Sequence, residues 1–258
     1  MDDSTPRSST SEITFAILSY GFAELTIRCI DSIRKFEPNS SIIVLDNHSP
    51  DDSFAQLTAK YATDPQIRLI ASERNLGVAL GRNNIAKQIS TDYIAFIDND
   101  AFLTGPASFD SLKYLAVQTT VAYGYPLMLD DKLNCYFYNI ENKPVDAIGG
   151  AFLVVKTAIF RQFGGFDETY GVFGHEDVEF GLRLKSKGFV LIGNINIPVI
   201  HEDHHSSSLL DNKSQLEDNT QQLLLSQWGT HQNLLEINRQ HIDFLSCTKC
   251  EETWSRSK

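Results

Sequence analysis

Three features are missing from this chain of 258 residues, and each absence excludes a class of protein. The chain has no long run of Lys and Arg, and its acidic residues outnumber the basic ones by 33 to 22, so nonspecific nucleic-acid binding is not expected. Its longest apolar stretches have the length of a strand, far below the roughly 20 residues of a transmembrane helix. Asp2 and Asp3 stand where a signal peptide would be basic and then apolar. We therefore expect a cytoplasmic protein without a transmembrane span, with a disordered tail over residues 1–11.

Cysteine is scarce and unevenly spaced. The chain has four cysteines, which argues against a disulfide framework and fits a reducing compartment. Cys247 and Cys250 have the spacing of half a zinc site, but His231 and His241 upstream of them do not share one face of a helix. A solvated tail over residues 247–258 is therefore favoured, and a zinc site stays the alternative.

The first half of the sequence alternates between β-rich runs and segments in which apolar residues have helical spacing. Strands separated by helices in this way are typical of right-handed crossovers, which build a largely parallel sheet. The pattern therefore predicts a Rossmann-like α/β half. The expected strands are residues 13–20, 41–45, 67–71 and 93–97, and the expected helices are residues 22–36, 53–61 and 77–89.

The second half predicts a mixed sheet, because two strand-like runs flank a polar connection and the later runs have the character of edge strands. The expected strands are residues 120–125, 148–155, 189–195 and 198–201, and the expected helices are residues 156–163 and 176–187. Segment 214–245 is expected to be helical, and its leucines need a partner surface, either within the domain or in a homodimer. We expect one domain over residues 12–208 and a helical extension over residues 209–246.

Polar residues follow the predicted parallel strands at the edge where ligands bind in such sheets. Tyr20 follows the first strand, Asp46 and Asn47 follow the second, and the Asp-Asn-Asp of residues 98–100 follows the fourth. Each of these alone fits a turn or a helix cap. Together they predict a ligand-binding crevice at this edge of the sheet.

Asp98 and Asp100 are separated by one residue at the end of a predicted buried strand. Two carboxylates in such a place repel each other unless a cation lies between them. Hard oxygen ligands suit Mg²⁺ or Mn²⁺, and such an ion commonly bridges protein carboxylates to a diphosphate. A solvated turn is the alternative interpretation, but the position directly after the strand favours a metal site.

Six short segments of the chain carry further motifs. They are residues 44–53 (VLDNHSPDDS), 74–83 (RNLGVALGRN), 98–100 (DND), 149–153 (GGAFL), 164–168 (GGFDE) and 175–183 (HEDVEFGLR). In this order the segments resemble the inverting nucleotide-sugar glycosyltransferases of glycosyltransferase family 2, over a stretch from Ile13 to His201. The resemblance implies the GT-A fold, an α/β fold in which helices flank a mostly parallel sheet that becomes mixed.

The resemblance also implies roles for individual residues. Asp98 and Asp100 would hold a Mn²⁺ or Mg²⁺ ion, and Asp46 would accept a hydrogen bond from the nucleotide base. His201 would be a third metal ligand, and an exposed loop histidine is an equally good interpretation of it. The residues implied in donor binding are Ser19, Tyr20, Asp46, Asn47, Asn75, Gly77, Arg82, Asn83, Asp98 and Asn99.

An inverting displacement needs a base beside the acceptor hydroxyl, and Glu176 and Asp177 are the candidates. Both lie in the first turn of a predicted helix, where the helix dipole favours carboxylates. Helical spacing places Asp177 on one face with Phe180. It places Glu176 on a more polar face, together with an expected surface pair of Glu179 and Arg183. We therefore choose Asp177, which is also the usual base by family resemblance; in a third interpretation both acids only stabilise the helix start.

The chain has no Gln-x-x-Arg-Trp motif, in which it departs from processive members of the family. We therefore expect a non-processive transferase of cell-surface glycan or polysaccharide biosynthesis. A UDP- or dTDP-sugar is the expected donor and a glycan or lipid-linked molecule the acceptor, with peripheral association at the inner face of the membrane as a further expectation. A non-catalytic nucleotide-sugar or carbohydrate-binding module stays an alternative. A sugar-nucleotide pyrophosphorylase is less favoured, because no Gly-rich, basic loop follows the first strand.

Overall fold

The structure, a computed structural model, describes most of the chain. It describes residues 12–137, 139–202, 209–210 and 212–236. The two expected tails, residues 1–11 and 247–258, lie outside this part, and so do Cys247 and Cys250. Among the helices that the structure describes, none combines the length and the apolar character that crossing a membrane requires.

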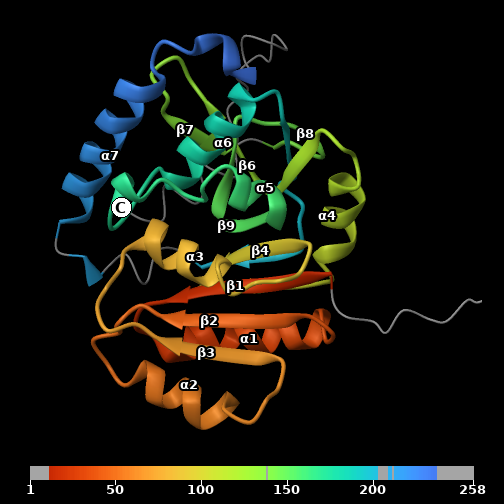
Figure 1. Cartoon of the computed structure of the whole chain (residues 1–258), viewed down its shortest axis with the longest axis vertical. Coiled ribbons are helices and arrows are strands. Elements are labelled where there is room, and N and C mark those ends of the chain that lie inside the picture. Colours follow the sequence, from red (N-terminus) through yellow and green to blue (C-terminus); the bar gives the residue numbers. More distant parts are fainter. Residues whose placement is uncertain (1–11, 138, 203–208, 211, 237–258) are drawn as a thin grey trace, which may run out of the picture.

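A mixed sheet of nine described strands forms the centre of the molecule, in the order β3-β2-β1-β4-β9-β6-β10-β8 with β7 paired to β6 (Figure 1). β1, β2, β3 and β4 are parallel to one another, as the alternating pattern predicts. β9 is antiparallel to both β4 and β6, so the predicted change to a mixed sheet is confirmed. The strands are β1 (Ile13–Ser19), β2 (Ser41–Asp46), β3 (Ile67–Ala71), β4 (Tyr93–Asp98), β5 (Ala101–Leu103), β6 (Thr120–Leu129), β7 (Cys135–Phe137), β8 (Lys143–Pro144), β9 (Ala147–Lys156), β10 (Val190–Gly193) and β11 (Val199–His201).

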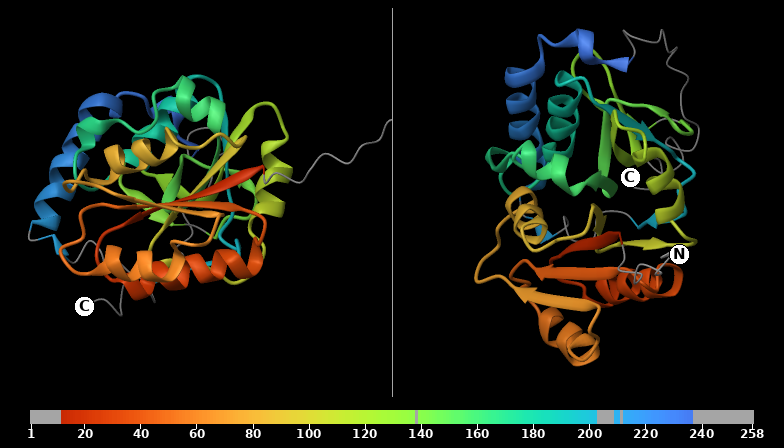
Figure 2. Two further views of the ribbon diagram at one scale, coloured as in Figure 1. Left: turned by 60° about the horizontal axis from the view of Figure 1, so that its bottom comes forward. Right: turned by 45° about the vertical axis from the view of Figure 1, so that its right-hand side comes forward.

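Helices cover both faces of this sheet (Figure 2, left). α1 and α2 lie against one face, and α3, α5 and α6 lie against the other, so the alternating side chains of the central strands β1, β2, β4, β6 and β9 are buried on both sides. In β1, for example, Phe15 and Ile17 point to the α1 side and Ala16 points to the α3 side. The helices are α1 (Ala23–Phe36), α2 (Ser53–Tyr61), α3 (Val78–Ala86), α4 (Ser108–Leu115), α5 (Thr157–Gln162), α6 (Glu176–Ser186) and α7 (Lys213–Trp228), with the 3-10 helices η1 (Glu168–Tyr170) and η3 (Gln232–Leu234).

A separate two-stranded ribbon of β5 and β11 stands beyond the carboxyl end of β4. β11 falls within an expected strand, whereas β5, like α4, was not predicted. Each strand of the ribbon has three residues, which is too short for an alternating pattern to show. The pairing sets His201 opposite Ala101, directly after Asp100. The ribbon therefore brings together residues that are a hundred positions apart in the sequence.

The C-terminal helix α7 packs within the same chain. Leu224 and Leu235 are buried in a third apolar cluster, together with Leu129 of β6 and Val178 and Leu182 of α6. Of the two partner surfaces that the leucines allow, the described residues show the intramolecular one. The helix is shorter than expected, because α7 ends at Trp228 and is followed by η3, and residues 237–245 lie outside the described part.

We predict that Leu224→Ala lowers the free energy of unfolding by about 2–5 kcal/mol, because it leaves a cavity in a packed cluster. Leu224 has no exposed surface. Denaturant unfolding of the purified chain measures the change. Gln222→Ala, an exposed position on the same helix, is the matched control. Equal stability of Leu224→Ala and the control would contradict the packing of α7 in the core.

Candidate active site

Asp98, Asp100 and His201 form a cluster that can hold a metal ion. One ligand atom from each lies within 4.8 Å of the others. The Nε2 atom of His201 is 3.1 Å from Oδ1 of Asp100 and 3.6 Å from Oδ2 of Asp98. Asp98 ends β4, Asp100 lies in the turn between β4 and β5, and His201 ends β11. Two carboxylates and an imidazole are a donor set that suits Mn²⁺ or Mg²⁺, so the residues present fit a divalent ion.

The electrostatics of Asp98 also favour a nearby cation. Burial raises the pKa of Asp98, although Arg82 and His201 lower it, and Asp100 adds to the rise. Burial therefore disfavours the ionised form of Asp98, and a divalent ion beside it would stabilise that form.

Arg82 of α3 connects this cluster to the rest of the site. Its side chain is 5% exposed. Its Nη2 atom donates to Oδ1 of Asp98 at 2.6 Å and to the carbonyl oxygen of Gly150 at 3.0 Å. Its Nη1 atom donates to Oε1 of Glu176 at 3.3 Å. Burial lowers the pKa of Arg82, but Asp98, Glu176 and Asp177 outweigh that effect and raise it, so the guanidinium stays charged.

Glu176 and Asp177 begin α6 beside this guanidinium. Glu176 is buried against Arg82, whereas Asp177 is half-buried. Asp177 accepts a hydrogen bond from the amide of Gly150 at 2.7 Å through Oδ2. Its Oδ1 atom accepts from the amide of Val178 at 2.8 Å. Both candidate bases are therefore part of the site, and only Asp177 keeps partial exposure.

The helix-face argument that separated the two acids is wrong in its premise. The face of α6 that carries Glu176, Glu179 and Arg183 is not a solvated surface, because both glutamates are buried. Arg183 pairs with Glu179 at 2.6 Å, and it also donates to the carbonyl oxygens of Phe163 and Gly165. This pair therefore fixes the Gly-Gly turn before η1 and is not the expected surface pair.

The segments expected to bind the donor surround the carboxyl ends of β1 and β2. Asn47 donates to Oδ1 of Asn75 at 3.0 Å and accepts from the amide of Leu76 at 2.8 Å, which fixes the turn before α3. Asp46 is buried, and both of its carboxylate oxygens accept hydrogen bonds from Ser49. Tyr20 is half-buried.

Gly77 has a structural role in this region. It has a φ of 75°, and a Cβ atom there would lie 2.5 Å from the carbonyl oxygen of Gly171. The close approach that the glycine allows is therefore to the loop before α6.

Three other expected donor residues are engaged inside the protein. Oγ of Ser19 is 2.8 Å from Oγ1 of Thr26, and Asn99 donates to the same hydroxyl at 3.2 Å. Asn83 donates to the carbonyl oxygen of Phe166 and to Glu168, and it accepts from the amide of Phe166. These side chains support the end of β1, the turn after β4 and the turn before η1.

Gly150 is a site residue to which the sequence analysis gave no role, although it lies in the motif of residues 149–153. Its carbonyl oxygen accepts from Arg82 and its amide donates to Asp177. A Cβ atom at this position would lie 2.5 Å from Nη1 of Arg82. The Gly-Gly pair inside a predicted strand was the available signal, because such glycines mark close approach of another group.

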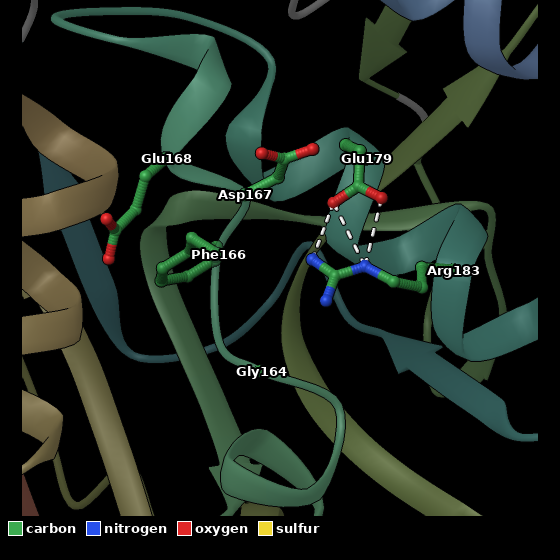
Figure 3. Close-up of a pocket in the computed structure, with 6 residues that line it drawn as sticks. All are labelled: Gly164, Phe166, Asp167, Glu168, Glu179 and Arg183. Carbon is green, nitrogen blue, oxygen red and sulfur yellow. Dashed lines mark hydrogen bonds and ion pairs between the residues drawn. The ribbon is translucent and has the colours of Figure 1, made fainter.

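A hollow of about 430 Å³ is lined by residues of the turn before η1, of η1 and of α6 (Figure 3). Glu179 and Arg183 face each other in it, and Glu168 points away from them toward α3. Its lining residues all belong to the motif segments 164–168 and 175–183, but none of them was given a role in the predicted site. The lining residues are Gly164, Phe166, Asp167, Glu168, Glu179 and Arg183.

Comparison with known proteins agrees with this geometry. The family model described as Glycosyl transferase family 2 matches residues 14–126. An O-antigen biosynthesis protein RfbC of Myxococcus xanthus is 24% identical, over 66% of this chain and 15% of its own length. An N-acetylglucosaminyl-diphospho-decaprenol L-rhamnosyltransferase of Mycobacterium tuberculosis is 25% identical, over 65% of this chain and 68% of its own. The predicted resemblance to glycosyltransferase family 2 is thereby confirmed.

The solved structures show the fold. GalNAc-T7 with UDP, GalNAc and Mn²⁺ superimposes with a TM-score of 0.65 at 13% identity, over 76% of this chain and 44% of that chain. The predicted GT-A fold is therefore confirmed. This chain spans less than half of that protein and about 15% of the O-antigen protein, so the comparison extends to only part of each.

Glu176 gives the site a pH dependence that can be measured. Burial raises the pKa of Glu176 from 4.5 to about 7, with Asp177 adding to the rise and Arg82 opposing it. The folded state therefore binds this proton more tightly than the unfolded state. Its contribution to stability is fully present below the unfolded value of 4.5 and is lost as the pH rises through about 7.

We predict that the free energy of unfolding falls less in Glu176→Gln than in the wild type as the pH is raised from about 5 to about 8, because the glutamine carries no charge at any pH. Melting temperatures across this range measure the difference. Glu24→Gln, an exposed change of the same kind, should follow the wild type. A wild type and a Glu176→Gln variant with parallel pH profiles would rule out the raised pKa.

Proposed function

We propose that this chain is a non-processive, inverting glycosyltransferase, which moves a sugar from a nucleotide-diphosphate donor to an acceptor hydroxyl in cell-surface glycan or polysaccharide biosynthesis. The observation that carries the proposal is the Arg82 guanidinium. It connects the metal-binding cluster at Asp98 to the start of the helix that carries Asp177. A metal centre and a reachable carboxylate are the two groups that such a displacement needs. The family match and the transferase names of the relatives support the same proposal.

The metal ligands in this proposal are Asp98, Asp100 and His201, with Mn²⁺ or Mg²⁺ as the ion. When bound, the ion supplies positive charge that offsets the negative charge growing on the departing diphosphate. Oδ1 of Asp98 accepts from Arg82, and Oδ2 of Asp98 lies 3.6 Å from Nε2 of His201. GalNAc-T7 is described with Mn²⁺, which supports the choice of ion.

The donor in this proposal is a UDP- or dTDP-sugar bound at the ends of β1 and β2. Asp46 would accept a hydrogen bond from the base, because a carboxylate that accepts from Ser49 at each oxygen still has further lone pairs. Tyr20 is half-buried and Asn75 is exposed, so both would contact the nucleotide directly. Ser19, Asn47, Asn83 and Asn99 would act by holding the turns around it.

Asp177 is the proposed base, and access decides between it and Glu176. Glu176 is buried and paired with Arg82, so an acceptor hydroxyl cannot reach it without breaking that pair. Asp177 is half-buried, and its two hydrogen bonds from the amides of Gly150 and Val178 fix the direction of the carboxylate. A base held in this way can take the proton of a hydroxyl placed beside it.

The proposed acceptor is a glycan or a lipid-linked sugar, with the protein at the inner face of the membrane. The support is the name of the mycobacterial relative, in which the acceptor is linked to decaprenol. The runner-up function, a non-catalytic nucleotide-sugar or carbohydrate-binding module, is not favoured, because the chain keeps both metal carboxylates and a reachable Asp177.

We predict that Asp100→Ala abolishes the part of nucleotide affinity that depends on the metal, because the cluster loses one of its two carboxylates. Titration calorimetry with UDP and with dTDP, each with and without Mn²⁺, measures this. Asp92→Ala, at an exposed position before β4, is the matched control. A Mn²⁺-dependent gain in affinity that persists in Asp100→Ala would refute the metal assignment.

We predict that Asp177→Asn lowers kcat by about 10² to 10⁴-fold while donor binding and Mn²⁺ affinity stay unchanged, because the amide cannot take a proton. Transfer from the donor that binds best is measured, and the anomeric configuration of the product is determined by NMR. Asp218→Asn, an exposed change on α7, should keep wild-type turnover. Near-normal turnover of Asp177→Asn would remove the base assignment, and a retained configuration would refute an inverting displacement.

A further inference from the structure

The C-terminal segment, residues 212–236, contacts both ends of the helix that carries Asp177. At the start of α6, Nδ1 of His175 lies 2.9 Å from Oγ1 of Thr220 on α7. At the end of α6, Nζ of Lys185 lies 2.7 Å from Oε1 of Glu236. α7 runs alongside α6 between these contacts (Figure 2, right). The family match ends at residue 126, so this arrangement lies outside the matched part.

The contact at the start of α6 holds a backbone conformation that is uncommon for residues other than glycine. His175 precedes α6 with a φ of 64°, in the left-handed region that few residues other than glycine adopt. Such a conformation persists where surrounding contacts hold it. Oγ1 of Thr220 lies 3.0 Å from the carbonyl oxygen of Leu216, to which it donates within its own helix. Oγ1 of Thr220 can then also accept a hydrogen bond from the Nδ1–H of a neutral His175.

The neutral state of His175 agrees with its surroundings. Burial lowers the pKa of His175, although the nearby Asp177 and Glu217 raise it. The carbonyl oxygen of His175 also accepts from the amide of Glu179 at 2.9 Å, which is the first hydrogen bond of α6. The position of His175 therefore sets the direction in which the helix starts.

The contact at the end of α6 is a buried ionic cluster. Lys185 is 2.7 Å from both Asp146 and Glu236, and all three side chains are almost completely buried. Asp146 also accepts from the backbone amides of Leu129 and Glu236 at 2.9 Å and 2.8 Å. Separating such a cluster is costly, because each partner that is removed leaves an uncompensated buried charge. α6 is therefore held at its end as well as at its start.

We propose that residues 212–236 position α6 for catalysis, with His175 and Thr220 as the positioning residues for Asp177. The inference rests on the proposed function. Asp177 stands two residues after His175, and its carboxylate is held by the amide of Gly150 at 2.7 Å. A rotation of the first turn of α6 would move that carboxylate away from Gly150 and from the acceptor. Displacements of about 1 Å at a reacting group can cost a hundredfold in rate.

Thr220→Val tests this role, because it keeps the shape of the side chain and removes the hydroxyl. We expect kcat to fall by about 10-fold to 100-fold, while the donor KM and the Mn²⁺ affinity stay as in the wild type. Thr220→Ser, which restores the hydroxyl, should recover kcat. Ser226→Ala is the matched control, because this exposed hydroxyl on α7 contacts the carbonyl oxygen of Leu223 in its own helix.

A second variant and a second measurement make the test independent of folding and of turnover. His175→Asn keeps a residue type that tolerates the left-handed conformation and shortens the side chain that reaches Thr220. Hydrogen exchange of the Gly150 amide reports on its bond to Asp177 without any donor or acceptor. At a temperature where all variants are folded, this amide should exchange faster in Thr220→Val and His175→Asn, and as in the wild type in Ser226→Ala.

Three results separate the inference from the function on which it rests. Wild-type kcat together with unchanged Gly150 exchange in Thr220→Val would overturn the inference and leave the proposed function standing. A fall in Mn²⁺ affinity equal to the fall in kcat would also overturn it, because the change would then not be confined to α6. No transfer by the wild-type chain from any nucleotide-sugar of a panel would overturn the proposed function and with it the role of Asp177.

Discussion

One buried guanidinium group holds the candidate site together. Arg82 bonds to the carboxylate of Asp98, to the backbone of Gly150 and to the carboxylate of Glu176, and it lies near Asp177 as well. These partners come from β4, β9 and α6, so the guanidinium connects the candidate metal site to the helix of the proposed base. Removing one partner of a buried ion pair costs about 3–5 kcal/mol, because the remaining charge is left uncompensated. Asp98 and Glu176 can therefore lie close together in the fold, since the positive charge of Arg82 lies between the two carboxylates.

Amide side chains make up the next layer of support. Asn47 holds the turn before α3, Asn83 holds the turn before η1, and Asn99 bonds to Thr26 beneath the end of β1. An amide offers donors and an acceptor in one plane, so it can satisfy both the N–H and the C=O groups of a turn. A motif residue near a ligand site therefore need not touch the ligand. A turn that lines the site can require an amide side chain to hold it, just as a direct contact with the ligand would.

The sequence predicted the regular part of the fold because periodic patterns are strongest there. The parallel strands from Ile13 to Asp98 and the helix over residues 53–61 appear where the alternation places them. The β5–β11 ribbon was missed in part, because three-residue strands show no period and their pairing joins distant segments. Asp98 and Asp100 could be chosen from their position after a strand, whereas the ribbon that brings His201 to them could not be predicted.

The choice between Glu176 and Asp177 shows why a polar helix face is a weak guide to exposure. The polar face of α6 packs on Arg82 at one position and supports its own Arg183 at another, so it is buried although it is charged. Sequence spacing shows which residues share a face, but the residue that covers this face, Arg82, comes from a helix almost a hundred positions earlier. Burial raises the pKa of Glu176 to about 7, which suits a base, and the same burial puts it out of reach of an acceptor. In the proposed mechanism, access therefore favours Asp177 over Glu176 as the base, because a proton can pass only between groups in contact.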